Sequence, residues 1–213
     1  MKLNKFKAII IASIIVSTFA VYKGYIMLRD KTSQLTTVTR SVEDYDIDGG
    51  TFTDPRDGKV YQTLTFDNQE WMAENLAYEP DIGNYWAYNN DKSNIETYGY
   101  LYDWETACDV CPDGWHLPAD AEWTELTNYI GGRKEETGRL IWNFSGKGNA
   151  GGKMKETGTA HWHSPNNGAT NISGFSALPG GYRRSYRGTF HSMGDYALFW
   201  SSSKDFIFSA FRW

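Results

Sequence analysis

The sequence lacks the residue patterns that identify most enzymes and cofactor-binding proteins. No glycine elbow surrounds the serines at 201–203, and no glycine pair belongs to a phosphate-binding loop. Histidine is scarce, with four in the chain. His161 and His163 would share one face of a strand, but no set of four zinc ligands can be assembled around them. We therefore expect no catalytic residue, no metal and no cofactor, and we expect that the protein is not an enzyme.

Positive charge is also scarce in the body of the chain. Residues 1–29 carry five cationic side chains and no acid. Because the whole chain has a net charge of −5, residues 30–213 carry −10. An acidic surface without a basic stripe excludes nucleic acid as a partner and disfavours docking on anionic lipid. The acidic charge favours solubility.

A long apolar run occurs only at the N-terminus. Three lysines precede an uncharged apolar segment, residues 8–22, which Lys23 closes. A basic region followed by an apolar core is typical of a secretory signal, and the segment is short for a spanning helix of about 20 residues. We expect residues 1–29 to be a hydrophobic helix that acts as a signal peptide or, if uncleaved, as a membrane anchor. The protein is then exported, to the cell envelope, the outer surface or the medium.

Cysteine is limited to Cys108 and Cys111. In an exported protein such a closely spaced pair predicts a tight local disulfide, with two free thiols as the alternative. The Cys-x-x-Cys spacing also occurs in thioredoxin-like redox sites, but the surrounding sequence shows no βαβ pattern. Redox catalysis is therefore not expected.

Aromatic residues and glycine are abundant, with 16 % aromatics, 9 Trp and 21 Gly. This composition predicts a loop-rich domain whose core consists of large rings held by tight turns. Residues 30–50 are polar and aperiodic, as in a linker, and residues 51–213 suffice for one domain.

The coarse pattern of elements indicates an α+β fold. Residues 59–66 and 69–75 are rich in β-formers and are separated by Asp67-Asn68, which predicts a hairpin. Asp120 is expected to cap a helix that presents Trp123, Leu126 and Ile130 on one face and stops at Gly131-Gly132. A short helix is expected within residues 151–157, and two strands within residues 196–213.

Several phrases of the sequence, taken in order, resemble the Fibrobacter succinogenes major paralogous domain, abbreviated FISUMP. They include residues 57–61 (DGKVY), 69–76 (QEWMAENL), 98–104 (YGYLYDW), 111–118 (CPDGWHLP), 151–157 (GGKMKET), 178–183 (LPGGYR) and 199–203 (FWSSS). The resemblance covers roughly residues 51–213. It implies a bacterial protein with a single C-type-lectin-like domain, the fold of formylglycine-generating enzymes, with short twisted strands, one main helix and long Gly/Trp-rich loops.

The resemblance also implies which residues are structural. They are Trp71, Trp104, Trp115, His116, Pro118, Trp123, Gly180, Gly181 and Trp200. Domains of this family usually continue past the Trp-Ser-Ser region through another strand pair, so the C-terminal strands are expected to be shortened. Formylglycine-generating relatives use two copper-binding cysteines late in the fold, where this chain has none.

The remaining aromatic residues favour a binding role. Exposed rings stack on sugars or anchor protein contacts, and arginine supplies directed hydrogen-bond donors. The candidate ligand-binding residues are Trp86, Tyr88, Tyr182, Arg183 and Tyr186. We expect an adhesion or carbohydrate-binding module that presents these loops to a surface glycan or an envelope protein. The alternatives are a structural envelope or assembly component without a small ligand, and a variable-loop display protein.

Overall fold

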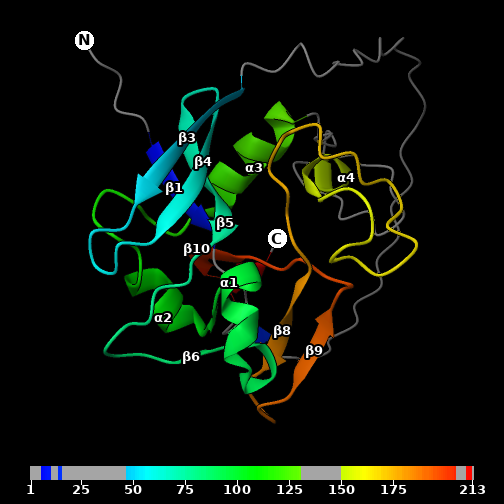
Figure 1. The fold of residues 1–213 in the computed structure, drawn as a ribbon. Helices are drawn as coiled ribbons and strands as arrows, with labels where there is room; N and C mark the ends of the chain where they lie inside the picture. Colours follow the sequence, from blue (N-terminus) through cyan, green and yellow to red (C-terminus); the bar gives the residue numbers. More distant parts are fainter. Residues whose placement is uncertain (1–5, 11–13, 16–46, 131–149, 205–209, 213) are drawn as a thin grey trace, which may run out of the picture.

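The computed structural model describes residues 6–10, 14–15, 47–130, 150–204 and 210–212, which form an α+β domain (Figure 1). The strands are β1 (Phe6–Ile10), β2 (Ile14–Ile15), β3 (Ile47–Thr53), β4 (Val60–Phe66), β5 (Gln69–Asn75), β6 (Tyr85–Trp86), β7 (Leu101–Tyr102), β8 (Gly180–Arg184), β9 (Phe190–Met193), β10 (Trp200–Lys204) and β11 (Ala210–Arg212). The helices are α1 (Ile95–Tyr98), α2 (Trp104–Asp109), α3 (Asp120–Tyr129) and α4 (Ala150–Met154), with 3-10 turns η2 (Tyr88–Asn90) and η3 (Lys92–Asn94).

The largest sheet has the strand order β1-β5-β4-β3. The predicted hairpin is confirmed, since β4 and β5 pair antiparallel with Phe66 opposite Gln69. Asp67 takes the positive φ of 55° that a two-residue turn requires. β3 begins at Ile47, so the last residues of the segment expected to be a linker are in strand β3.

The expectation of an N-terminal helix is wrong for the residues that the structure describes there. Phe6–Ile10 is strand β1, parallel to β5, and Ile14–Ile15 is strand β2, parallel to β8. The segment is rich in isoleucine, whose β-branched side chain favours extended backbone. Residues 11–13 and 16–46, on which most of the expected helix and linker fall, lie outside the described residues. Within the described ranges, no helix has the length and hydropathy needed to cross a membrane.

Helix α3 buries the predicted face, with Trp123, Leu126 and Ile130 each at most 1 % exposed. The predicted cap is wrong: Asp120 is the first residue inside the helix and Ala119 precedes it. The Ala119 amide donates to Glu122 Oε2 at 2.7 Å, and the Asp120 amide donates to Ser203 Oγ. The side chain of Glu122, three residues into the helix, therefore replaces the expected aspartate cap. The predicted stop at residues 131–132 lies outside the described residues.

Glu122 also holds His116 in place. His116 Nε2 lies 2.7 Å from Glu122 Oε1, and this hydrogen bond raises the pKa of the imidazole. The half-buried His116 therefore links the loop before α3 to the first turn of that helix.

The interior consists of two apolar clusters on opposite faces of β5. Trp71 points into the cluster that includes Trp123, Phe175 and Phe199, and Met72 points into the other. Alternate residues of a strand face opposite sides, so β5 is covered on both faces. The second cluster comprises Tyr61, Met72, Leu76, Ala87, Tyr100, Tyr102, Ala107, Val110, Trp115, Leu117 and Trp200.

The indole rings attach loops to the core through hydrogen bonds. Trp104 Nε1 donates to the Ser201 carbonyl at 2.9 Å, and Trp200 Nε1 donates to the Tyr102 carbonyl at 2.9 Å. A buried indole N–H needs such a partner. Trp71, Trp115, Trp123, Trp200, Pro118, Gly180 and Gly181 are buried, and Trp104 is half-buried. The composition argument, that large rings fix the loops, is confirmed.

The expected disulfide is not formed. Cys108 and Cys111 are not joined to each other, and both side chains pack against the cluster around Met72. Cys108 lies in helix α2, and Cys111 follows two residues after the end of that helix. Burial raises the pKa of the Cys111 thiol to about 12.

We expect Cys111 to react with Ellman's reagent at least tenfold more slowly in the native chain than in the unfolded chain. The thiolate is the reactive species, and near pH 8 a thiol of raised pKa holds far less of it than a free cysteine of pKa about 8.5. A Cys108→Ser variant isolates the signal of Cys111, and the same variant in denaturant gives the reference rate. Equal rates in the native and the unfolded variant would contradict the shielding of Cys111. A mass of the unsubstituted chain two hydrogens below that of its reduced form would show that the two cysteines form a disulfide.

Candidate functional site

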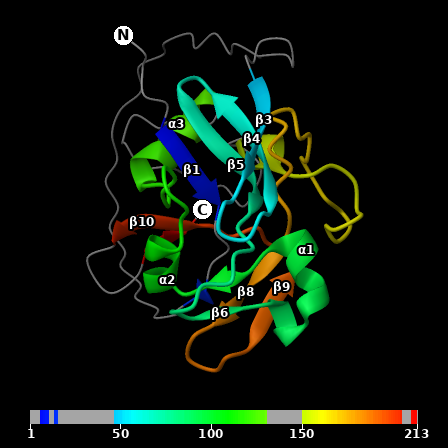
Figure 2. The same ribbon diagram turned by 60° about the vertical axis from the view of Figure 1, so that its left-hand side comes forward.

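The structure brings three of the predicted binding residues together. The Arg183 guanidinium of β8 lies 3.9 Å from the ring centroid of Trp86 in β6 and 5.7 Å from that of Phe190 in β9. Tyr88 packs on Phe190 with centroids 5.4 Å apart, and its hydroxyl accepts a hydrogen bond from the Met193 amide. Figure 2 shows β6, β8 and β9 gathered at one end of the molecule.

The arginine of this cluster is enclosed by rings rather than paired with an acid. Burial lowers the pKa of Arg183, and its Nε has no hydrogen-bond partner. Among the described residues, no carboxylate lies within ion-pair distance of it. The guanidinium covers one face of Trp86, so this ring is not the open stacking platform that the sequence predicts.

The other two predicted residues lie apart from this cluster. Tyr182 stacks on His191, with centroids 5.5 Å apart and an interplanar angle of 27°. Tyr182 pairs with His191 and Arg183 with Phe190, and the two side chains point to opposite faces of β8, so the Tyr182 ring is not part of the Arg183 cluster. Tyr186 lies in the turn between β8 and β9 and is 86 % exposed.

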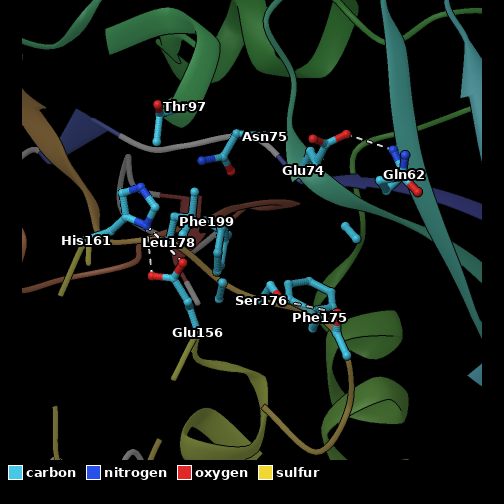
Figure 3. A pocket seen from close by; sticks show the side chains of 13 residues that line it. Gln62, Glu74, Asn75, Thr97, Glu156, His161, Phe175, Ser176, Leu178 and Phe199 are labelled. Carbon is cyan, nitrogen blue, oxygen red and sulfur yellow. Dashed lines mark hydrogen bonds and ion pairs between the residues drawn. The ribbon is translucent and has the colours of Figure 1, made fainter. Parts of the chain in front are cut away.

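A pocket of about 310 Å³ opens between β5, α1 and the loops around Glu156 and Phe175 (Figure 3). Sequence reasoning did not predict this pocket. Its polar side chains come from three separate stretches of the chain, and the buried ring of Phe199 contributes apolar surface. The lining residues are Gln62, Ala73, Glu74, Asn75, Thr97, Glu156, His161, Gly174, Phe175, Ser176, Ala177, Leu178 and Phe199.

One wall of the pocket is the pair formed by Glu156 and His161. The imidazole Nδ1 lies 2.9 Å from both carboxylate oxygens, and the Tyr98 ring meets the imidazole edge-on with centroids 5.9 Å apart. Burial, and secondarily the charge of Glu156, raise the pKa of Tyr98. With Nδ1 bound to the carboxylate, the orientation of the ring is fixed.

The opposite wall is formed by Glu74 and Asn75 at the end of β5. Glu74 Oε2 accepts a hydrogen bond from the Gln62 amide at 2.7 Å, and Asn75 Nδ2 donates to the Tyr98 carbonyl at 2.9 Å. Each side chain is held by one hydrogen bond and keeps further acceptor capacity, because a carboxylate and an amide oxygen have several lone pairs. The pocket thus has oriented acceptors on two sides and apolar surface between them.

Metal binding has no support in this geometry. Within the described ranges, no three His, Cys, Asp or Glu side chains converge as metal ligands. His163, considered with His161 in the sequence, points elsewhere, with its Nδ1 3.0 Å from Asp195 Oδ1.

The family model for the Fibrobacter succinogenes major domain matches residues 65–212. The chain belongs to this family. No curated protein and no solved structure matches it.

All lining residues of the pocket except Gln62 lie within the residues that the family model matches. Glu74, Asn75, Glu156 and His161 all fall within the matched residues, whereas β1 and β2 fall before them. Two of the phrases that carry the resemblance, residues 69–76 and 151–157, contain Glu74, Asn75 and Glu156. That was the available signal for the site, although nothing in the sequence places these phrases next to each other.

Proposed function

We propose that the protein is an exported, surface-associated module whose pocket binds a residue of a neutral glycan. The observation that carries the proposal is the arrangement of Glu74, Asn75, Glu156 and His161 around apolar surface that includes Phe199. A sugar presents hydroxyl groups that donate and accept, together with an apolar C–H face. Fixed acceptors beside an aromatic ring match both features.

The charge of the pocket argues for a neutral ligand. Glu74 and Glu156 are both carboxylates, and neither is paired with a lysine or arginine in the described part of the chain. An anionic sugar would bring like charges together in a partly desolvated site, which is unfavourable. The volume of about 310 Å³ is at the lower end of ligand pockets, which supports one sugar ring rather than a longer segment.

Binding without hydrolysis is the activity that this arrangement supports. The Glu156 carboxylate is occupied by His161 through both oxygens, and Glu74 accepts a backbone amide. These contacts hold the two acids in fixed orientations, and each carboxylate still has lone pairs to accept a hydrogen bond from a ligand hydroxyl.

Two coarser expectations accompany the proposal. Export to the bacterial cell envelope or surface is supported by the lysine-flanked apolar segment at residues 8–22. A C-type-lectin-like arrangement is supported by the ordered phrases of the sequence and by the α+β organisation with long loops. Determining the N-terminus of the protein isolated from its cells, and an experimental structure of the domain, would test these expectations.

We expect the full chain to bind neutral polysaccharide on a glycan array that includes insoluble plant polymers. Glu156→Gln should weaken binding about tenfold or more, because a hydrogen bond to a charged group contributes roughly 1.5–3 kcal/mol. Glu105→Gln, an exposed change in α2 outside the pocket, is the matched control. Binding should persist with chelator, and no sugar should be released.

Two results would contradict the proposal that the pocket binds a glycan. A cooperatively folded chain that binds no glycan would overturn the proposal in favour of a structural envelope component. Equal loss in Glu156→Gln and Glu105→Gln would place the binding site outside the pocket.

A further inference from the structure

The N-terminal strand β1 occupies a place in the core of the domain. It lies parallel to β5 at the edge of the largest sheet, with Ala8 opposite Trp71 (Figure 2). Ala8 is 2 % exposed and belongs to the apolar cluster of Trp71, Trp123 and Phe175. It also forms a parallel bridge with His116. A small side chain is therefore enclosed between β5 and the loop that precedes α3.

The next strand, β2, has a similar place in a second sheet. Ile14 and Ile15 pair parallel with Arg183 and Arg184 of β8, so that β2 is the edge strand of the order β2-β8-β9. Consecutive pieces of one apolar segment thus complete the edges of two sheets. We call the two edges together, along Gln69–Asn75 and Arg183–Arg184, the strand slot.

The residues that fill the strand slot are the residues of the export segment. If the segment is cleaved on export, β1 and β2 leave with it. If it is retained as an anchor, it lies in the bilayer and cannot pair with β5 at the same time. Either way, the exported domain has an open edge on β5, with unpaired backbone N–H and C=O groups and an uncovered apolar cluster.

We propose that in the exported protein another polypeptide fills the strand slot with an extended apolar strand. The argument rests on the export part of the proposed function. The occupant that the structure accepts defines its chemistry: a β-branched, apolar stretch, parallel to β5, with a small residue at the position of Ala8. A second copy of this chain cannot supply the same strand, because each exported copy has given up its own. Pairing of this kind gives affinity through main-chain hydrogen bonds and specificity through the alternate side chains.

The test begins with the full chain. A protease site inserted between Lys31 and Thr32 is cut after folding, and gel filtration then shows whether the N-terminal fragment stays with the body. We expect the fragment to co-elute, and we expect a labelled peptide of residues 5–16 to exchange into the slot at saturating concentration. In both forms Ala8→Glu should weaken retention more than tenfold, because it places a charge in the apolar cluster. A peptide with the reversed sequence is the control for parallel pairing.

Each outcome decides the matter. The strand slot is overturned if the body still unfolds cooperatively but loses the fragment and shows no saturable binding of the peptide. It is also overturned if the Ala8→Glu peptide is retained as well as the unchanged peptide. If the protein isolated from its cells keeps residues 6–15 outside the membrane and paired with β5, its own strand fills the slot and the partner strand is excluded. Glycan binding by the full chain is unaffected by any of these results, so the proposed function fails or stands separately.

Discussion

Replacing Trp71 by alanine is expected to lower the free energy of unfolding by about 3–5 kcal/mol, as for other buried tryptophans. The side chain is fully buried, and its ring centroid lies 4.8 Å from that of Trp123. Its Nε1 donates to Gln69 Oε1 at 3.1 Å, so the substitution also leaves a buried acceptor with one partner fewer. Domains of this size are stable by only about 5–15 kcal/mol, and the variant should be close to unfolding. Chemical denaturation followed by circular dichroism measures the change.

Trp86→Ala is the matched control for this prediction. Trp86 is half-buried at the margin of the cluster around Met72, and the Arg183 guanidinium over its ring contributes about 0.5–2 kcal/mol. Its expected cost is therefore well below that of Trp71→Ala. Similar losses in the two variants would contradict the division between core rings and loop rings.

Gly181→Ala is the second substitution with a large expected effect, about 3 kcal/mol or more. Gly181 has φ +64°, and an added Cβ would lie 2.6 Å from the Met193 amide nitrogen and closer still to the His191 carbonyl. These contacts are backbone atoms of β9, which cannot move away without breaking the pairing of Gly180 with Met193 and of Tyr182 with His191. Thermal unfolding should show the loss, with disturbed packing of Arg183 on Trp86.

Two other glycines separate the causes of this effect. Gly168 has φ +73° but no atom within 4 Å of an added Cβ, so Gly168→Ala reports the strain of positive φ alone, about 1–2 kcal/mol. Gly151 is exposed in α4 with open space around it, and Gly151→Ala should raise stability by about 0.5–1 kcal/mol. A loss in Gly181→Ala no greater than in Gly168→Ala would show that β9 tolerates the side chain.

The local elements could be read from the sequence because their signals are local. The alternation over residues 59–75 and the positive φ at Asp67 define the β4–β5 hairpin within a few residues. The apolar spacing of Trp123, Leu126 and Ile130 defines the buried face of α3 in the same way. The helix cap was predicted wrongly because Glu122, two residues after Asp120, accepts the hydrogen bond from the Ala119 amide at the start of the helix.

The grouping of the candidate aromatic residues could not be predicted, because it depends on which faces meet. Trp86 and Tyr88 come together with Arg183 from a distant part of the chain, whereas Tyr182 points to the other face of β8 and Tyr186 lies apart in the turn. Tyr182 and Arg183 are neighbours in sequence, which suggested that they belong to one site. Side chains alternate along β8, however, so the two residues lie on opposite faces of the strand. The rings of Trp86 and Phe190 also pack against the Arg183 guanidinium, a contact that the composition of the sequence does not reveal.

The sequence by itself determined the family, the α+β class and the tryptophan-stapled core, since ordered phrases, periodicity and composition are properties of the chain. Only the tertiary structure decided that Glu74 and Asn75 meet Glu156 and His161, because that meeting depends on how β5 packs beside distant loops. It also decided the place of the apolar N-terminal segment. Hydropathy alone fits a signal, an anchor or a buried strand equally well, and the pairing of Phe6–Ile10 with β5 depends on residues about 60 positions away in the chain.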